Sequence, residues 1–402
     1  MGGGECDVIV EKPQEPYFGA APRSDRTRSN TMGRSSAYPA IFPTFMQAAR
    51  VTAHSTGQPV RLAINGYGRI GRCFLRALHA SPYRETFRIV AINEPADTAT
   101  ISYLTRFDST HGVFPGTVEA EGECLKIDGQ PIAVTHALTP EGVDWKALGV
   151  DLLVECSGRY TRRADLQRFL DAGCRRLLLS HPGHSAQDVD LTIVYGINHQ
   201  AITGCERIVS NASCTTNAIV PVLDLLDREF GVEHALMTTL HSVMNDQPLI
   251  DGYHHADLRL TRSAMQSIIP VATGLARGVE RLLPQLKGRT QAKAVRVPIL
   301  NVSAIDLVVG LRRDAGAEAI NALFAEAARS APAGLFAYSG EPHASVDFNH
   351  NPHSATVDGS QTRTIGPRMA NLFIWFDNEW GYANRLLDVA ACWSKRFAQN
   401  GP

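Results

Sequence analysis

The amino-acid sequence predicts an α/β protein in two parts: a parallel sheet covered by helices, then an α+β region with a mostly antiparallel sheet. Three observations predict it. Up to about residue 212, short apolar strands alternate with helical patterns, as in parallel sheets buried on both faces. Beyond that point longer strand-like segments appear. At 402 residues, 44% of them hydrophobic, the chain is long enough to bury two cores.

The first 59 residues have a composition unlike the rest. Glycine, proline, serine and arginine dominate residues 1–59, with no sustained strand or helix period. Such a segment buries too little apolar surface to offset its ordering entropy, so we expect a disordered extension. The acidic residues Glu5 and Asp7 argue against a transit peptide, and a later start at Met46 is an alternative.

The charge balance and the cysteine pattern exclude several classes of protein. The 39 lysines and arginines against 40 acidic residues lack the basic surplus of a general nucleic-acid binder. No apolar run approaches the roughly 18–20 residues of a membrane span, and no secretory signal is visible. The eight cysteines show neither metal-binding spacing nor a disulfide pattern, so we expect free thiols in the cytoplasm and no metal.

The first ordered segments read as strand, glycine-rich turn, helix and strand. Residues 60–65 form an apolar strand pattern, residues 66–71 contain Gly-x-Gly-x-x-Gly, and a helical pattern follows over 72–79. A second strand, 87–93, ends just before Glu94. A lone glycine motif often marks only a turn, but this succession is the dinucleotide-binding context.

Each glycine of the motif has its own expected task. Gly66 allows the tight turn, Gly68 lets a pyrophosphate approach the backbone, and Gly71 lets the helix pack on the strand. The phosphate oxygens then meet the N–H groups of the helix start. Glu94 would accept hydrogen bonds from the adenine ribose hydroxyls and repel a 2′-phosphate, which favours NAD over NADP.

Further apolar strand patterns extend this sheet. They lie at residues 151–156, 176–180 and 191–195. Ligands of parallel sheets collect at the carboxyl ends of the strands. Ser157-Gly158 and Ser180-His181 fall there, so they are candidate cofactor neighbours. The alternative is that they are ordinary loop residues.

Cys214 stands between an apolar strand pattern at 207–210 and a helical pattern at 218–230. A cysteine at a helix start faces unpaired N–H groups and the positive end of the helix dipole, which favour a thiolate. The same donors could hold the oxyanion formed when a thiolate attacks a carbonyl. We therefore predict a nucleophile here, while the alternative is a small buried hydrophobic residue, as most free cysteines are.

His241 is the candidate base for this thiol. It ends a strand pattern at 234–241 and begins a long polar stretch over 243–270, a place where side chains reach a domain interface. It could take the thiol proton and later move protons on the substrate, although a structural histidine is the alternative. A Cys/His pair also suggests a cysteine hydrolase, but a hydrolase has no use for a hydride acceptor.

The second part of the chain carries several strand patterns, at 234–241, 292–298, 303–309 and 371–376. We expect a largely antiparallel sheet with one face packed and one face open. Arg296 alternates with apolar neighbours in one of these strands, and its guanidinium suits a phosphate. Thr273 and Gly274 offer a hydroxyl and a backbone N–H to an anion. The alternative for Arg296 is an exposed arginine that is only solvated.

Five motifs, in order over about residues 60–398, resemble those of glyceraldehyde-3-phosphate dehydrogenases. They are residues 65–72, 210–217, 238–241, 296–298 and 377–382, of which the second, Ser-Asn-Ala-Ser-Cys-Thr-Thr-Asn, is highly specific. Within the family, the chain is most similar to the erythrose-4-phosphate dehydrogenase branch. That likeness lies in residues 179–183, 241–247, 346–355 and 358–363.

The resemblance implies a Rossmann NAD-binding domain over 60–212, a catalytic domain over 213–377, and a C-terminal helix, 378–398, that packs back on the first. It implies Cys214 as the nucleophile and His241 as the base. The positions implied to hold NAD, together with Ser180 from the strand ends, are Gly66, Gly68, Arg69, Ile70, Gly71, Glu94, Asn378 and Tyr382. Those implied to bind the substrate are Ser213, Thr215, Asp246, Thr273, Gly274 and Arg296. The family is usually tetrameric, with residues 243–266 as an S-shaped loop at the subunit interface.

Three positions depart from the common family pattern. Met244 stands where the triose enzymes usually carry a threonine, so the substrate-phosphate site loses a hydroxyl, which fits a four-carbon substrate. Leu260 stands where many relatives have a second arginine, and it removes a cation from the anion site. Ala218 replaces a second cysteine four residues after the nucleophile, so an oxidised Cys214 lacks that resolving thiol.

The resemblance therefore implies NAD-dependent oxidation of D-erythrose 4-phosphate, a small phosphorylated aldose, to 4-phosphoerythronate. The aldehyde would form a hemithioacetal on Cys214, and water would cleave the resulting thioester, giving a product for pyridoxal 5′-phosphate biosynthesis. One alternative is a phosphorylating glyceraldehyde-3-phosphate dehydrogenase of glycolysis. Another, from a different class of protein, is an NAD-binding redox sensor without catalysis.

Overall fold

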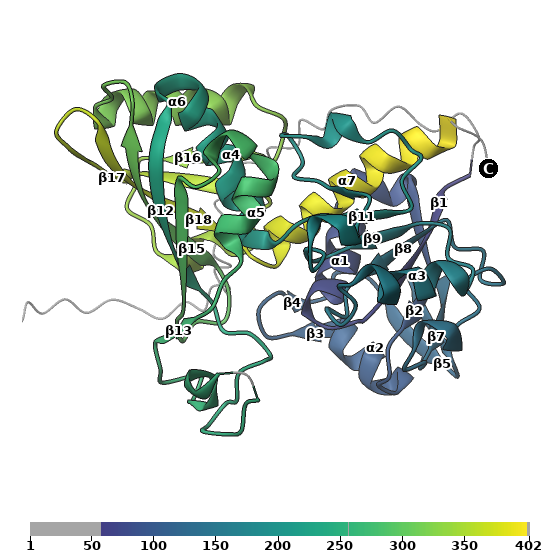
Figure 1. Cartoon of the computed structure of the whole chain (residues 1–402). Coiled ribbons are helices and arrows are strands. Elements are labelled where there is room, and N and C mark those ends of the chain that lie inside the picture. The colour runs from purple at the N-terminus through teal and green to yellow at the C-terminus, as the bar shows by residue number, and fades with distance from the viewer. Residues whose placement is uncertain (1–57, 256, 400–402) are drawn as a thin grey trace, which may run out of the picture. The chain divides into compact units, whose positions relative to one another are not determined.

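The computed structural model describes residues 58–255 and 257–399, which form two large sheets with their helices (Figure 1). The disordered extension expected at 1–59 falls almost wholly outside these residues. The α/β class is confirmed, and so are the two kinds of sheet that the strand patterns predict. Within the described residues, no helix is long and apolar enough to cross a membrane.

The first strand of the chain lies in the middle of the first sheet. In spatial order its strands are β10 (Leu191–Thr192), β11 (Ile208–Ser210), β9 (Leu177–Leu179), β8 (Leu152–Glu155), β1 (Val60–Asn65), β2 (Phe87–Asn93), β7 (Gln130–Thr135), β6 (Cys124–Ile127) and β5 (Val118–Glu121). Strands β10 to β7 pair in parallel, and β5 and β6 add an antiparallel edge. Because β1 lies between β8 and β2, the turn after it opens where the strand order reverses, which is where such sheets bind ligands.

Helices cover this sheet on both faces. Helices α1 (Arg69–Ala80) and α7 (Trp380–Gln399) share one core with Leu62 and Ile64 of β1. Helix α3 (Arg163–Asp171) shares another with Ala63, the residue between them, because successive strand residues point to opposite faces. Figure 1 shows α7, in yellow, lying beside α1, so the end of the chain returns to the first core. Helix α2 (Thr98–Arg106) and a short hairpin of β3 (Phe107–Asp108) and β4 (Gly112–Val113) follow β2.

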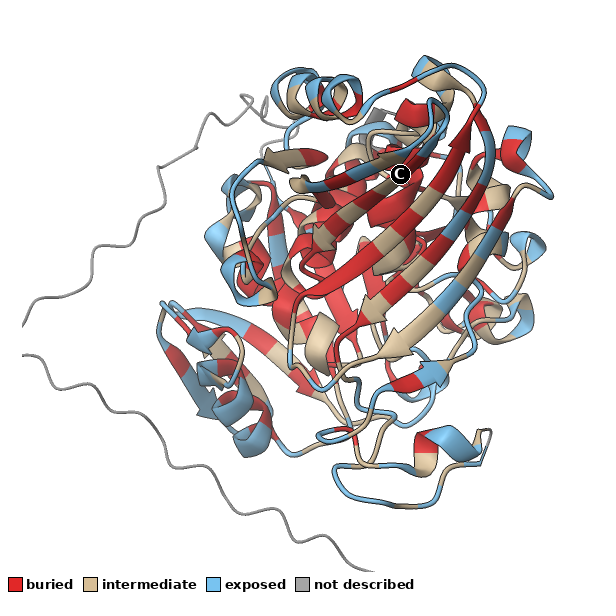
Figure 2. Ribbon diagram, turned by 90° about the vertical axis from the view of Figure 1, so that its left-hand side faces the viewer, coloured by how far each residue is buried: buried red, intermediate tan, exposed pale blue. Residues whose placement is uncertain are grey.

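The second sheet is largely antiparallel. Its spatial order is β13 (Ile269–Val271), β14 (Thr290–Arg296), β12 (Val232–His241), β15 (Ser303–Leu311), β18 (Met369–Phe376), β17 (Ala355–Ile365) and β16 (Phe336–Ser339). The pairs β12–β14 and β16–β17 are parallel. Helices α4 (Cys214–Phe230), α5 (Leu275–Leu282) and α6 (Ala317–Ser330) contribute to the core on one face. Figure 2 shows buried and partly exposed residues alternating along the strands, so the other face is open, as expected.

Two helices begin earlier than their apolar patterns predict. Helix α4 starts at Cys214 rather than at residue 218, and α1 starts at Arg69 rather than at residue 72. The first turn of α4 is polar, so hydrophobic periodicity carries no signal there. A cap stabilises it instead: the Ser213 hydroxyl accepts a hydrogen bond from the Thr216 N–H.

Candidate active site

Cys214 is the first residue of α4, and its sulfur lies among hydrogen-bond donors. The Thr215 hydroxyl is 3.8 Å from Sγ. The backbone N–H groups of Cys214 and Thr215 also act to lower the pKa of the thiol. The Asn217 amide donates to the carbonyls of Asn211 at 2.8 Å and Ser213 at 3.0 Å. These bonds tie the preceding loop to the first helical turn, so the position of the thiol is fixed.

The loop before Cys214 adopts an unusual backbone conformation. Ala212 has φ of +54°, a left-handed value that costs a non-glycine residue roughly 1–2 kcal/mol. The Tyr382 hydroxyl donates to the Ala212 carbonyl at 3.0 Å, and Ser210 Oγ accepts from the Ala212 N–H at 3.1 Å. Tyr382, expected among the cofactor residues, is buried and uses its hydroxyl to hold this loop.

His241 ends β12 and faces the thiol. Its Nε2 lies 3.7 Å from Cys214 Sγ, and its Nδ1 is 2.8 Å from the Ser242 carbonyl. A carbonyl can only accept, so Nδ1 carries the proton and Nε2 presents its lone pair to the sulfur. The structure thus brings together the two residues that the sequence proposes as nucleophile and base.

Burial shifts the pKa of both members of this pair. Burial raises the pKa of the Cys214 thiol, although Thr215, the helix N–H groups and Arg296 act in the opposite direction. Burial also lowers the pKa of His241 to about 4. Both shifts favour the neutral forms near pH 7, because neither charged form is well solvated. A neutral His241 can receive the thiol proton at Nε2.

Arg296 ends β14 directly beside His241 in the sheet register. Its NH1 lies 3.4 Å from the Asp246 carboxylate and 3.3 Å from Gln247 Oε1. The Arg296 side chain is 12% exposed and that of Asp246 is 47% exposed. The guanidinium therefore reaches the site with a carboxylate already beside it. Met244, in the same loop, is exposed and offers no hydroxyl.

Thr273 and Gly274 lie at the start of α5. Both are exposed, and Thr273 Oγ1 accepts a hydrogen bond from the Leu275 N–H at 3.2 Å. The first turns of α5 and α4 are neighbours, because a Cβ on Gly278 would lie 3.2 Å from Thr216 Oγ1. The two neighbouring helix starts, with the hydroxyls of Ser213, Thr215 and Thr273 at or near them, suit an anion.

The glycine-rich turn has the geometry that a dinucleotide needs. Gly66 has φ of +84°, and a Cβ there would lie 2.5 Å from the Ser157 nitrogen. A Cβ on Gly71 would lie 2.4 Å from the Gly66 carbonyl oxygen, so this close helix–strand contact also requires glycine. Gly68 is the N-cap of α1, which leaves the N–H groups of the following residues, Arg69 and Ile70, without helical partners.

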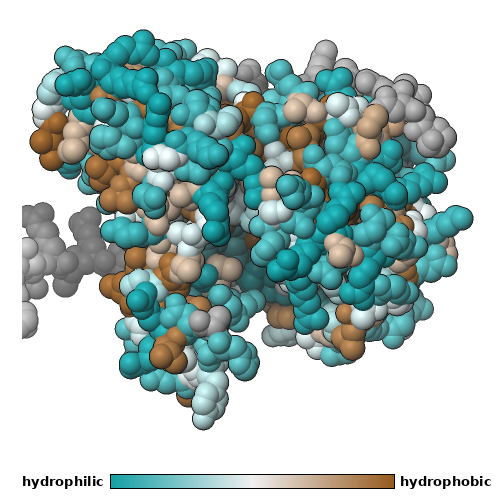
Figure 3. Space-filling view, in the orientation of Figure 1, coloured by the Kyte–Doolittle hydropathy of each residue, from teal (hydrophilic) through white to brown (hydrophobic). Residues whose placement is uncertain are grey.

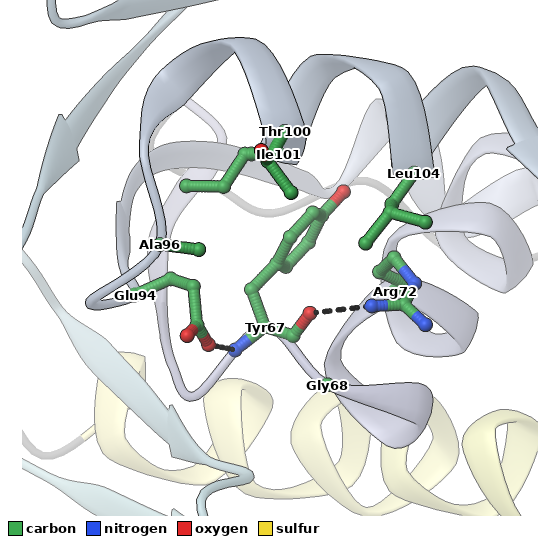
Figure 4. A pocket seen from close by; sticks show the side chains of 8 residues that line it. All are labelled: Tyr67, Gly68, Arg72, Glu94, Ala96, Thr100, Ile101 and Leu104. Atoms are coloured by element: carbon green, nitrogen blue, oxygen red, sulfur yellow. Dashed lines mark hydrogen bonds between the residues drawn. The ribbon is translucent and has the colours of Figure 1, made fainter.

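Glu94, at the end of β2, borders the same turn. Its carboxylate accepts a hydrogen bond from the Tyr67 N–H at 2.7 Å (Figure 4). One cleft lies around Tyr67, with Arg72 and Leu104 in its wall. A second cleft, also bordered by Glu94, runs over the carboxyl ends of β1, β2 and β8. It is lined by Asn65, Gly66, Asn93, Leu138, Ser157 and Tyr160.

A buried carboxylate that the sequence patterns missed lies beneath this cleft. Glu155 ends β8 and accepts hydrogen bonds from the Asn65 amide and from the N–H and hydroxyl of Ser157. Burial raises the pKa of Glu155 to about 7. The carboxylate braces the turn against which Gly66 packs. An acidic residue at the end of an otherwise apolar strand was the available signal.

Three further expected cofactor residues have defined partners. Ser180 follows β9, and its N–H donates to the Glu155 carbonyl at 2.9 Å. The Arg69 guanidinium is bound to Glu379 and Asp108, so only its backbone N–H is left for a ligand at the glycine-rich turn. Asn378 Oδ1 accepts from the hydroxyls of two serines, Ser242 and Ser303, at 3.1 and 2.8 Å. The NH₂ end of Asn378 is therefore the end left for a ligand.

Comparison with known proteins identifies the family. Residues 60–163 match the family described as glyceraldehyde 3-phosphate dehydrogenase, NAD binding domain, and residues 213–378 match its C-terminal domain. A Pseudomonas aeruginosa strain PAO1 protein named glyceraldehyde-3-phosphate dehydrogenase is 48% identical over 331 residues, which cover 82% of this chain and 97% of the relative. The chain belongs to the glyceraldehyde-3-phosphate dehydrogenase family. It is therefore an NAD-dependent dehydrogenase, an oxidoreductase, of that family.

Family membership confirms the family resemblance of the motifs and the expected cofactor, NAD. The erythrose-4-phosphate branch stays a prediction, because the relative carries the name of the triose enzyme.

Proposed function

We propose that the protein oxidises D-erythrose 4-phosphate with NAD and releases 4-phosphoerythronate by hydrolysis, in the cytoplasm. The observation that carries the chemistry is the contact between Cys214 Sγ and His241 Nε2 at the start of α4. Oxidation of an aldehyde through a thioester needs a nucleophile and a base next to a hydride acceptor. The free thiols of the described residues fit a reducing compartment.

The proposed mechanism uses these two side chains repeatedly. Cys214 Sγ attacks the aldehyde carbon while His241 Nε2 takes the thiol proton and passes it to the new hemithioacetal oxygen. The N–H groups at the start of α4 stabilise the charge on that oxygen. His241 takes the hydroxyl proton back when the hydride departs, and then releases that proton to solvent. Water then attacks the thioester, which releases the acid and restores the thiol.

The residues around the first sheet fit NAD, which supplies the hydride acceptor when it is bound. The free N–H groups of Arg69 and Ile70 would hold the pyrophosphate, and Glu94 would hold the adenine ribose. The NH₂ group of Asn378 would donate to the nicotinamide amide, with Ser180 nearby at the strand ends. Tyr382 would act through the Ala212 loop. We take residues 60–212 and 213–377 as the two domains.

The loop beside Arg296 supports the four-carbon substrate. Asp246 already neutralises part of the guanidinium charge, and Met244 provides no hydroxyl. A phosphate dianion is therefore disfavoured at this point, whereas a carboxylate beside a guanidinium can bind a sugar hydroxyl. D-erythrose 4-phosphate has one more hydroxyl than glyceraldehyde 3-phosphate between its aldehyde and its phosphate.

Substrate preference is tested by following NADH formation from each aldehyde, with and without inorganic phosphate. We expect faster oxidation of D-erythrose 4-phosphate in phosphate-free buffer, because water is the proposed acceptor. The alternative is the phosphorylating triose enzyme, which the name of the Pseudomonas relative favours. A preference for glyceraldehyde 3-phosphate with a strict phosphate requirement would establish that alternative.

Asp246→Asn is expected to favour the triose. Removing the carboxylate frees Arg296, so the kcat/KM ratio of the triose to the tetrose should rise by up to about fivefold, equal to about 1 kcal/mol. The control is Asp251→Asn, which removes the same charge from an exposed pair with Arg262 in the same loop. A ratio that changes equally in both variants would assign the effect to net charge.

We further propose a homotetramer. The segment between β12 and β13 projects from the second sheet, and Figure 3 shows hydrophobic side chains, in brown, on it. Its exposed large apolar residues, among those the structure describes, are Met244, Leu249, Ile250, Tyr253, Leu258, Met265 and Ile268. So many exposed apolar side chains on one segment are typical of a subunit interface.

A further inference from the structure

Asn378 lies between two buried carboxylates, Asp377 and Glu379. Oδ1 of Asp377 accepts hydrogen bonds from the N–H groups of Glu379 at 2.9 Å and Trp380 at 2.7 Å, so it caps α7. Its Oδ2 accepts the backbone N–H of His350 at 2.8 Å. One flank of Asn378 is therefore tied to the loop that carries His350.

The other flank is held by a separate chain of hydrogen bonds. Glu379 pairs with the Arg69 guanidinium through both carboxylate oxygens, and His111 Nε2 lies 2.7 Å from one of them. Burial alone would raise the pKa of Glu379, but the bonds from His111 and Arg69 lower it, so the group stays ionised. On the far side of His111, Nδ1 lies 2.7 Å from His350 Nε2.

His350 therefore connects both flanks of Asn378. Its backbone N–H holds Asp377, and its imidazole holds Glu379 through His111. The planes of the two imidazoles lie at 17° with their centroids 4.8 Å apart, which fits the edge-to-edge contact of their nitrogens. The His350 ring stacks on Trp380, also with centroids 4.8 Å apart. We call the residues that form this closed circuit, Asp377, Glu379, His111 and His350, the histidine ring.

The backbone of His350 has a conformation that glycine would adopt with less strain. Its φ is +66°, in the left-handed region that glycine occupies without strain. Glycine would keep the N–H bond to Asp377 and relieve that strain. The contacts of the imidazole, with His111 and with Trp380, are what a glycine would lose.

We propose that His350 is a positioning residue for the nicotinamide end of NAD. The histidine ring fixes both neighbours of Asn378, while Ser242 and Ser303 fix its side-chain oxygen, so the NH₂ group has one direction. This inference rests on the proposed role of Asn378 as the ligand of the nicotinamide amide. His350 itself need not touch the cofactor.

The test is to measure the binding of NAD and of ADP-ribose, which lacks the nicotinamide, to the full-length His350→Gly variant by calorimetry. We expect the Kd of NAD to rise about tenfold while that of ADP-ribose stays within about twofold. His111→Asn, which breaks the ring from the other side, should show the same contrast if the glycine variant does not fold. The control is His343→Ala, an imidazole bound to Ser339 in the preceding loop, which should change neither value.

Asn378→Ala, run in the same assay, separates the inference from its premise. If it weakens NAD selectively and His350→Gly does not, the ring has no positioning role and the inference is wrong. If Asn378→Ala instead weakens the binding of NAD and of ADP-ribose equally, the proposed contact of Asn378 with the nicotinamide amide is wrong, and so is the inference that rests on it. Equal weakening of both ligands by His350→Gly would assign His350 to general stability.

Discussion

Cys214→Ala is expected to abolish aldehyde-dependent NADH formation, by at least about 10,000-fold, while the Kd of NAD changes less than about threefold. Every covalent step of the proposed mechanism passes through the sulfur, whereas the proposed NAD ligands lie at the start of α1 and at Asn378. Absorbance assays give the first quantity, and calorimetry with NAD gives the second.

Cys205→Ala provides the matched control, because Cys205 is exposed and, unlike Cys214, does not lie at the start of a helix. It should retain normal turnover. If Cys214→Ala kept more than about one ten-thousandth of the wild-type rate of aldehyde oxidation, the covalent route would be refuted. If the intact protein bound NAD and its Cys214 were modified without any NADH formation, the redox-sensor alternative would hold.

His241→Asn is expected to lower kcat/KM by about 100- to 10,000-fold near pH 7 and to change the shape of the pH profile. The pKa of His241 is lowered to about 4, so in the wild type Nε2 is free to accept a proton above about pH 5 and is lost as a base as the pH falls through about 4. The wild-type rate should therefore vary little between about pH 6 and 8.

The variant must rely on ionisation of the thiol itself, whose pKa burial raises. Its rate should climb about tenfold per pH unit between about pH 7 and 9, and added imidazole should restore part of it. Parallel profiles for the two proteins would contradict the assignment of His241 as base. The measurement is kcat/KM across pH at saturating NAD.

Local patterns predict the framework of this site well. The strand, glycine turn and helix around residues 60–79 follow from periodicity and from the contacts that Gly66 and Gly71 must make. Cys214 at a strand-to-helix junction is also a local feature. The exact start of α4 is not, because side-chain caps rather than apolar spacing stabilise its first turn.

Contacts between distant segments could not be predicted. Arg69 and Glu379 are 310 residues apart in the sequence, and no local pattern predicts that the Arg69 side chain is bound to Glu379. The thiol protonation of Cys214 depends on burial, which follows only from the assembled fold. The Glu155 brace likewise needs β1 and β8 to be neighbours.

The bond from Tyr382 to the Ala212 loop has a consequence for synthesis of the chain. Tyr382 belongs to the last helix, whose Trp393 and Phe397 complete the core of the first sheet. A ribosome must therefore release nearly the whole polypeptide before the loop ahead of Cys214 is anchored. We expect an unfinished chain to lack the anchored loop before Cys214, so the site is completed only after α7 has packed on the first sheet.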